Sequence, residues 1–169
     1  MHTAAAGAGG RRAAYTWGMP DIDFAFLADA AETSPGQKFN VLGGGVSRIG
    51  GPGFPLRHPH LALVISLTVT APELDREHEI RFVLLDPEGG EVASATSQLV
   101  AHGNTEGKDT NLTFSVDLWN LQFNVPGEYS LRILVNGSER RRLPLSVVRS
   151  TEGMTTPPLS PPPGQKYEA

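Results

Sequence analysis

Hydrophobic and polar residues alternate along five segments of the chain, and this period of two is typical of half-buried β-strands. In the longest segment every second residue from Leu61 to Val69 is Leu, Ile or Val. The five segments are 61–69, 79–84, 112–118, 129–135 and 143–147. Weaker alternation is found at 22–28, 38–43 and 91–100. These segments bring the expected number of strands to about eight.

Turn sequences separate these segments. Residues 86–90 (Asp-Pro-Glu-Gly-Gly) and the pair Asn136-Gly137 predict hairpin turns, because their residues tolerate positive φ or preset a turn. The helical candidates are short, a doubtful helix at 29–32 and one turn at 118–123. Pro144 lacks an N–H and predicts a sheet edge or an outward-facing position in the last strand. The expected fold is therefore all-β, an antiparallel sandwich of about eight strands over residues 20–150.

Both ends of the chain differ from this core. Residues 1–18 are rich in Ala and Gly and lack the apolar run of a signal peptide, which predicts a disordered leader with Met19 as an alternative translation start. Residues 151–169 are rich in proline and predict an extended, disordered tail.

Composition excludes several classes of protein. With 14 Lys plus Arg against 18 Asp plus Glu, the net charge is −4, so a nucleic-acid partner is not expected. The chain has no cysteine, which excludes disulfides and thiolate chemistry. No apolar run approaches the roughly 20 residues of a membrane span, so a membrane partner is not expected either. Without a secretion signal, the predicted location is cytoplasmic.

The glycine-rich segment 43–53 fails the tests for a phosphate-binding loop. Gly45 and Gly50 have the spacing of such a loop, but Gly51 and Pro52 stand where Lys and Ser or Thr are needed. The dinucleotide fingerprint and the nucleophile elbow fail as well, the second because Ile49 occupies a glycine position. The segment is instead expected to be a bulged or tightly crossing strand.

Two histidines, His58 and His60, flank Pro59 and raise the question of a metal site. No local spacing identifies the third ligand that a catalytic zinc site needs. Neither catalytic residues nor a metal or cofactor site are therefore predicted. A candidate interaction loop remains, in which Phe54 either anchors a partner or folds back as a plug on one end of the sandwich. The plug is the favoured interpretation. Its candidate residues are Arg48, Phe54, His58 and His60.

Two resemblances add to this picture. The stretch Pro126-Gly127-Glu128-Tyr129, followed by Asn136-Gly137, resembles the penultimate strand of immunoglobulin-like sandwiches, which implies that the Tyr129 hydroxyl anchors a connection between sheets. The stretches 23–32 (DFAFLADAAE) and 39–45 (FNVLGGG) are similar to a family of uncharacterised bacterial proteins. That similarity implies a compact bacterial domain and carries no catalytic residue across.

Three functions are open at this point. The leading hypothesis is a non-enzymatic binding or assembly module whose partner is a protein, itself or another, because no nucleophile–base pair or phosphate loop is recognisable. An alternative is an enzyme whose active site matches no known motif and lies at one end of the sandwich, formed by Arg48, His58 and His60. The third is a structural subunit of a larger bacterial assembly that uses its sheet edges for strand addition.

Overall fold

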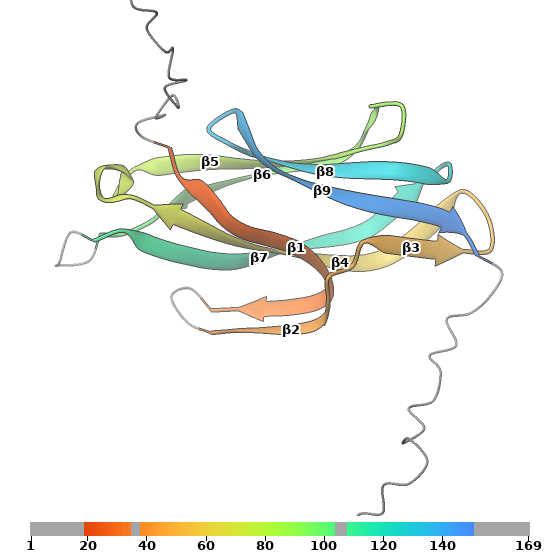
Figure 1. Ribbon diagram of the computed structural model, residues 1–169, viewed down its shortest axis with the longest axis horizontal. Coiled ribbons are helices and arrows are strands. Elements are labelled where there is room, and N and C mark those ends of the chain that lie inside the picture. The colour runs from red at the N-terminus through yellow and green to blue at the C-terminus, as the bar shows by residue number, and fades with distance from the viewer. Residues whose placement is uncertain (1–18, 35–37, 104–107, 151–169) are drawn as a thin grey trace, which may run out of the picture.

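Nine β-strands and one short 3₁₀ turn, η1 (Ala71–Glu73), make up the computed structural model, which describes residues 19–34, 38–103 and 108–150. Sheet A has the strand order β2-β1-β4-β7 and sheet B the order β3-β9-β8-β5-β6 (Figure 1). The strands are β1 (Asp21–Thr33), β2 (Phe39–Gly44), β3 (Arg48–Gly51), β4 (Leu56–Val69), β5 (Glu77–Leu85), β6 (Glu91–Val100), β7 (Thr110–Phe123), β8 (Gly127–Val135) and β9 (Ser138–Arg149).

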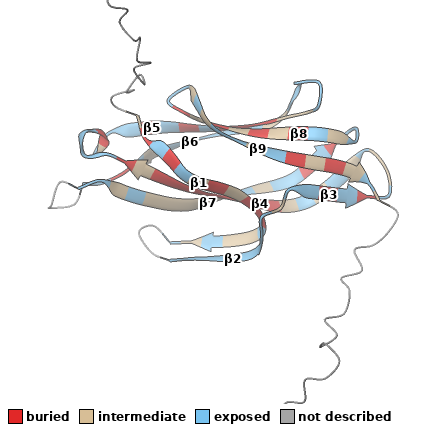
Figure 2. Cartoon of the chain, viewed as in Figure 1, coloured by how far each residue is buried: buried red, intermediate tan, exposed pale blue. Residues whose placement is uncertain are grey.

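The predicted all-β fold is confirmed. Alternating side chains of both sheets, such as Leu63 and Ile65 of β4 and Ile80 and Phe82 of β5, are buried in one core (Figure 2). Sheet B curls into a half-barrel, so the two sheets are less regular than in the expected sandwich. Among the described residues no helix is long and apolar enough to cross a membrane. The predicted leader and tail lie outside those residues.

Three local expectations are corrected. Residues 29–32 are not helical, because they continue β1 and pair with β2. Residues 118–123 stay within β7, where Asn120 adopts φ 53°. The ninth strand, β3, is four residues long and pairs parallel with β9, whereas the other strand pairs are antiparallel. Its two glycines hid it from the alternation pattern.

The predicted turns are confirmed. Asp86 closes the first hairpin, where its side chain accepts hydrogen bonds from the backbone N–H groups of Glu88 (2.9 Å) and Gly90 (2.7 Å). Asn136 and Gly137 adopt φ 48° and 79°, as a two-residue hairpin turn requires. Pro144 lies in the part of β9 that β3 does not reach, since β3 pairs only from Ser146 onward, so its missing N–H costs no sheet hydrogen bond.

Strand β4 is buried on both faces, contrary to the half-buried pattern expected of it. Its outward residues Ala62, Val64 and Ser66 are 0%, 0% and 2% exposed. On this side of β4 lies an arm formed by Ala30–Thr33 of β1 and Phe39–Leu42 of β2, which turns away below sheet A (Figure 1).

At the far end of this arm, the Thr33 hydroxyl accepts a hydrogen bond from the Ser115 N–H of β7 (2.9 Å). Because β4 lies between β1 and β7, the arm must cross the outer face of β4 to make this contact. The ring of Phe39 in β2 packs against that of Phe24 in β1, with centroids 5.9 Å apart. The arm is therefore attached at its end and along its length.

The connection from β7 to β8 carries the chain from sheet A to sheet B. At its end, the buried Tyr129 donates a hydrogen bond from its hydroxyl to the Val125 carbonyl (2.8 Å), and its ring packs edge-on against Phe123 at 5.0 Å. The predicted role of Tyr129 as an anchor of this connection is confirmed.

Replacing Tyr129 by Phe removes only the hydroxyl and keeps the ring contact. We expect the free energy of unfolding to fall by about 1 kcal/mol, the usual contribution of one hydrogen bond. Chemical denaturation with an unchanged m-value measures this loss. A variant as stable as the wild type would show that the hydroxyl does not hold the connection.

Candidate functional site

The four candidate interaction residues lie in three places rather than on one loop. Arg48 of β3 and His58 of β4 line a cavity. His60 lies two residues further along β4, against the start of the arm. Phe54, between β3 and β4, is half-buried and packs against the core, which favours the plug over the partner anchor.

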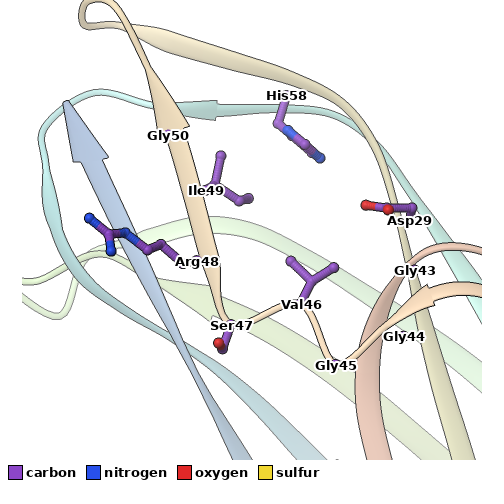
Figure 3. A pocket seen from close by; sticks show the side chains of 10 residues that line it. All are labelled: Asp29, Gly43, Gly44, Gly45, Val46, Ser47, Arg48, Ile49, Gly50 and His58. Carbon is purple, nitrogen blue, oxygen red and sulfur yellow. The ribbon is translucent and has the colours of Figure 1, made fainter. Parts of the chain in front are cut away.

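The cavity has a volume of about 440 Å³, within the size range of small-ligand sites (Figure 3). It lies where the chain passes from β2 in sheet A to β3 in sheet B. Its lining residues are Asp29, His58 and the segment 43–50.

Glycines make this passage between the sheets possible. The carbonyl of Leu27 accepts hydrogen bonds from the N–H groups of both Gly45 (2.8 Å) and Val46 (2.9 Å). Gly43 has φ 60° and Gly45 φ 87°, and any side chain on Gly43 would collide with the carboxylate of Asp29. The segment therefore crosses between the sheets as expected, but as the end of β2, a link at 45–47 and the separate strand β3 rather than as one strand. Backbone geometry accounts for Gly43 and Gly45 without a phosphate ligand.

His58 and Asp29 are the titratable groups that face each other across the cavity, beside Val46 and Ile49 (Figure 3). Partial burial lowers the pKa of His58, and the carboxylate of Asp29 opposes that shift without cancelling it. Arg48 and Ser47 point away from His58 in this view. The cavity thus presents an imidazole and a carboxyl group, with no nucleophile beside them among the lining residues.

His60 holds the start of the arm against sheet A. Its Nδ1 lies 2.8 Å from the Asp29 carbonyl oxygen and its Nε2 2.7 Å from Oδ1 of Asp117. Both partners are acceptors, so the ring nitrogens face the two oxygens as donors. The ring also packs against Trp119 at 4.1 Å, and Trp119 is 64% exposed. These contacts explain His60 structurally.

The two other histidines that the structure describes, His78 and His102, do not complete a metal site. His78 is buried, with Nε2 2.9 Å from the Glu73 carbonyl and Nδ1 3.2 Å from the Asn136 amide, and His102 lies beside Asp75. Over residues 19–34, 38–103 and 108–150, no three His, Asp or Glu side chains are arranged to hold a metal ion.

Strand β2 exposes apolar side chains along a free sheet edge. Leu42 is 71% exposed, Phe39 37% and Val41 36%, and these are three of the six exposed large hydrophobic residues in the described part of the chain. Phe39–Gly44 contains neither a charged residue nor a proline, the usual protections of a sheet edge. This is the largest group of exposed apolar residues on one described element.

Sequence reasoning missed the part played by this strand and by Asp29, Asp117 and Trp119. The sequence predicts a strand at 38–43, but the alternation does not show whether another strand pairs with its outer edge. Asp117 and Trp119 meet His60 through the β4–β7 register, which pairs His60 with Trp119 and Ala62 with Asp117. The uncharged run Phe39–Gly45 is the signal that could have pointed to an exposed edge.

Comparison with known proteins places the chain in a family. A profile of DUF6941, described as a family of unknown function, matches residues 23–148. The chain belongs to DUF6941. This match includes both sheets and the cavity, and it agrees with the resemblance to a family of uncharacterised proteins. None of the curated proteins compared with this DUF6941 chain matches it.

Two solved structures resemble the DUF6941 chain weakly. The alkylpurine DNA glycosylase AlkC of Pseudomonas fluorescens, bound to DNA containing an abasic site analog, has 13% identity and a TM-score of 0.44 over 78% of this chain and 31% of its own. The β-glucosidase of Listeria innocua, in complex with isofagomine, has 10% identity and a TM-score of 0.40 over 74% of this chain and 16% of its own. This chain thus spans less than a third of either protein, and neither likeness bears on its function.

Replacing Phe54 by Ala tests the plug. Because Phe54 is half-buried, we expect the free energy of unfolding to fall by about 2 kcal/mol, less than for a fully buried aromatic. Val125→Ala, at an exposed position, is the control and should change stability by less than about 0.5 kcal/mol. Equal stability of the two variants in urea would contradict the plug.

The lowered pKa of His58 predicts a loss of stability on acidification. In the unfolded chain the imidazole takes up a proton near its ordinary pKa of 6.5, whereas folded His58 resists protonation, so the free energy of unfolding falls as pH drops below that value. His58→Asn should reduce this fall between pH 7 and 5, measured by urea denaturation. Val100→Ala, at an exposed position without a titratable group, is the control and should leave the pH dependence unchanged.

Proposed function

We propose that this DUF6941 chain is a non-enzymatic, cytoplasmic binding module that takes up an extended strand of a protein partner along β2. The observation that carries the proposal is the free edge of β2, with Phe39, Val41 and Leu42 exposed beside unprotected backbone. A strand added there would gain main-chain hydrogen bonds, while the alternating side chains of β2 would select its sequence.

The other sheet edges are less suited to this role. The edge of β7 is met by Thr33 of the arm, whose hydroxyl takes up the Ser115 N–H. Strand β3 has only four residues. Strand β6 is longer, but most of its exposed residues are small or polar, and Val100 is its one exposed large hydrophobic residue. Apolar side chains and a free backbone edge coincide at β2.

The cavity supports the enzyme alternative less well. Among Arg48, His58 and His60, His60 is engaged by Asp29 and Asp117, and Arg48 points away from His58 (Figure 3). The cavity offers an acid–base pair without a nucleophile beside it, so binding is the better supported function.

We further infer an immunoglobulin-like relationship between the two sheets. The support is the Tyr129 hydroxyl bond to the Val125 carbonyl at the passage from β7 to β8, the place that a tyrosine corner occupies in such folds. A free sheet edge can take up an added strand, which also fits the structural-subunit alternative.

The proposal predicts that a charge on β2 abolishes partner binding without unfolding the chain. Leu42→Lys should lose the proteins that the full chain retains from a lysate of its native host, identified by mass spectrometry. Because Leu42 is 71% exposed, thermal stability should be nearly unchanged. Val100→Lys on β6 is the matched control and should retain the same proteins. If both variants retain them, β2 is not the binding edge.

A further inference from the structure

We propose that the cavity beside His58 binds a small primary amine, with the ammonium group of the ligand held between the side chains of Asp29 and His58. The inference goes beyond strand addition at β2 and does not rest on it, because a different part of the molecule carries it. Its basis is a cavity that combines an apolar wall with an unpaired acidic side chain and a ring that can accept a hydrogen bond.

The cavity has the size and the mixed lining of a small-molecule site. Its volume of about 440 Å³ lies toward the lower end of the range for such sites, which combine apolar walls with a few polar groups. Val46 and Ile49 supply the apolar wall, and both pack with the hydrophobic core, which holds them in place. Beside them, Asp29 and His58 point toward each other (Figure 3). The cavity therefore offers contacts for both a hydrocarbon chain and a polar head.

The side chain of Asp29 has no partner within the described part of the chain. Over residues 19–34, 38–103 and 108–150, no ion pair or hydrogen bond involves its carboxyl oxygens, although its backbone carbonyl meets His60. Its negative charge nevertheless acts on the cavity, because it opposes the effect of burial on the pKa of His58. An ammonium group is the natural complement of such a carboxylate, since a charge-assisted hydrogen bond is stronger than a neutral one.

His58 contributes an acceptor to the same space. Burial lowers the pKa of His58, which favours the uncharged ring. An uncharged imidazole has one acceptor nitrogen, whereas the charged ring has none. His58 in this form does not repel a cation at Asp29, and it can accept one of the three N–H groups that a primary ammonium carries.

Donors among the lining residues are used or directed elsewhere. The N–H groups of Gly45 and Val46 both bond to the carbonyl of Leu27. The side chain of Arg48 points away from His58 (Figure 3). An anionic ligand in the cavity would meet the charge of Asp29 without these donors, so the lining favours a cation.

Titration of the full-length, ¹⁵N-labelled chain with n-butylammonium chloride tests the site, with NMR amide shifts as the readout. At pH 7.5 we expect the amides of residues 43–50 to shift and to saturate in the millimolar range. Sodium pentanoate and butanol carry the same butyl group and should leave these amides nearly unchanged, as should sodium chloride at equal ionic strength. No saturable response to the amine, or an equal response to pentanoate or sodium chloride, would overturn the proposal.

Substitutions assign the binding to the cavity. Asp29→Asn removes the charge and keeps the size of the side chain, so the amine should bind about tenfold more weakly. Asp23→Asn, at an exposed position of the same strand outside the cavity, is the matched control and should leave the dissociation constant unchanged. His58→Phe keeps a ring and removes both nitrogens, and it should also weaken binding.

The amide spectrum shows in the same experiment whether each variant is folded. An amine that binds folded Asp29→Asn as tightly as the wild type would overturn the proposal. Equal weakening by Asp23→Asn would show a general effect of charge and overturn it as well. None of these outcomes affects strand addition at β2, which Leu42→Lys tests separately.

Discussion

The outer face of β4 imposes the constraint on which the rest of this molecule depends. An antiparallel sheet usually has one face on the core and one in water, but β4 is apolar on both faces. Its outward Ala62 and Val64 need a cover as much as its inward Leu63 and Ile65. Sheet B covers one face only. The chain meets the second need by extending β1 beyond its pairing with β4 and folding it back with β2 as an arm.

The surroundings of His60 and the position of the cavity follow from that arm. It begins where the Asp29 carbonyl meets His60, and it ends where Thr33 meets Ser115. After the arm, the chain still has to reach sheet B, and the glycine passage that takes it there leaves the cavity beside His58. The histidine contacts and the cavity are thus consequences of covering β4.

Sequence patterns predicted which residues form strands and turns better than they predicted what covers each strand face. Alternation located the core strands, and Asn136-Gly137 and Tyr129 identified a turn and a sheet connection, because these depend on local geometry. Whether a face of β4 is covered depends on where β1 goes after Ala28, which no local pattern encodes. The meeting of His60 with Asp117 and Trp119 likewise depends on the β4–β7 register. His58 and Arg48 were found by residue type, yet the meeting of Asp29 with His58 was not predicted, because Asp29 comes from the start of the arm.

Although the outer face of β4 is buried, an exposed apolar surface remains on β2. Ala62 and Val64 are buried, but β2 has a single sheet neighbour, β1, and it leaves Leu42 largely in water. A sheet edge of this kind normally carries a charge, a proline or a bulge to prevent pairing with another chain. In β2 the only breaks in the apolar run are Asn40 and the glycines that the passage to sheet B requires. The contact of the arm with Phe24 accounts for an apolar residue at Phe39 even without a partner. It does not account for Leu42, which takes no part in that contact. The exposure of Leu42 therefore has no explanation within the described part of the chain, and a strand added at this edge supplies one.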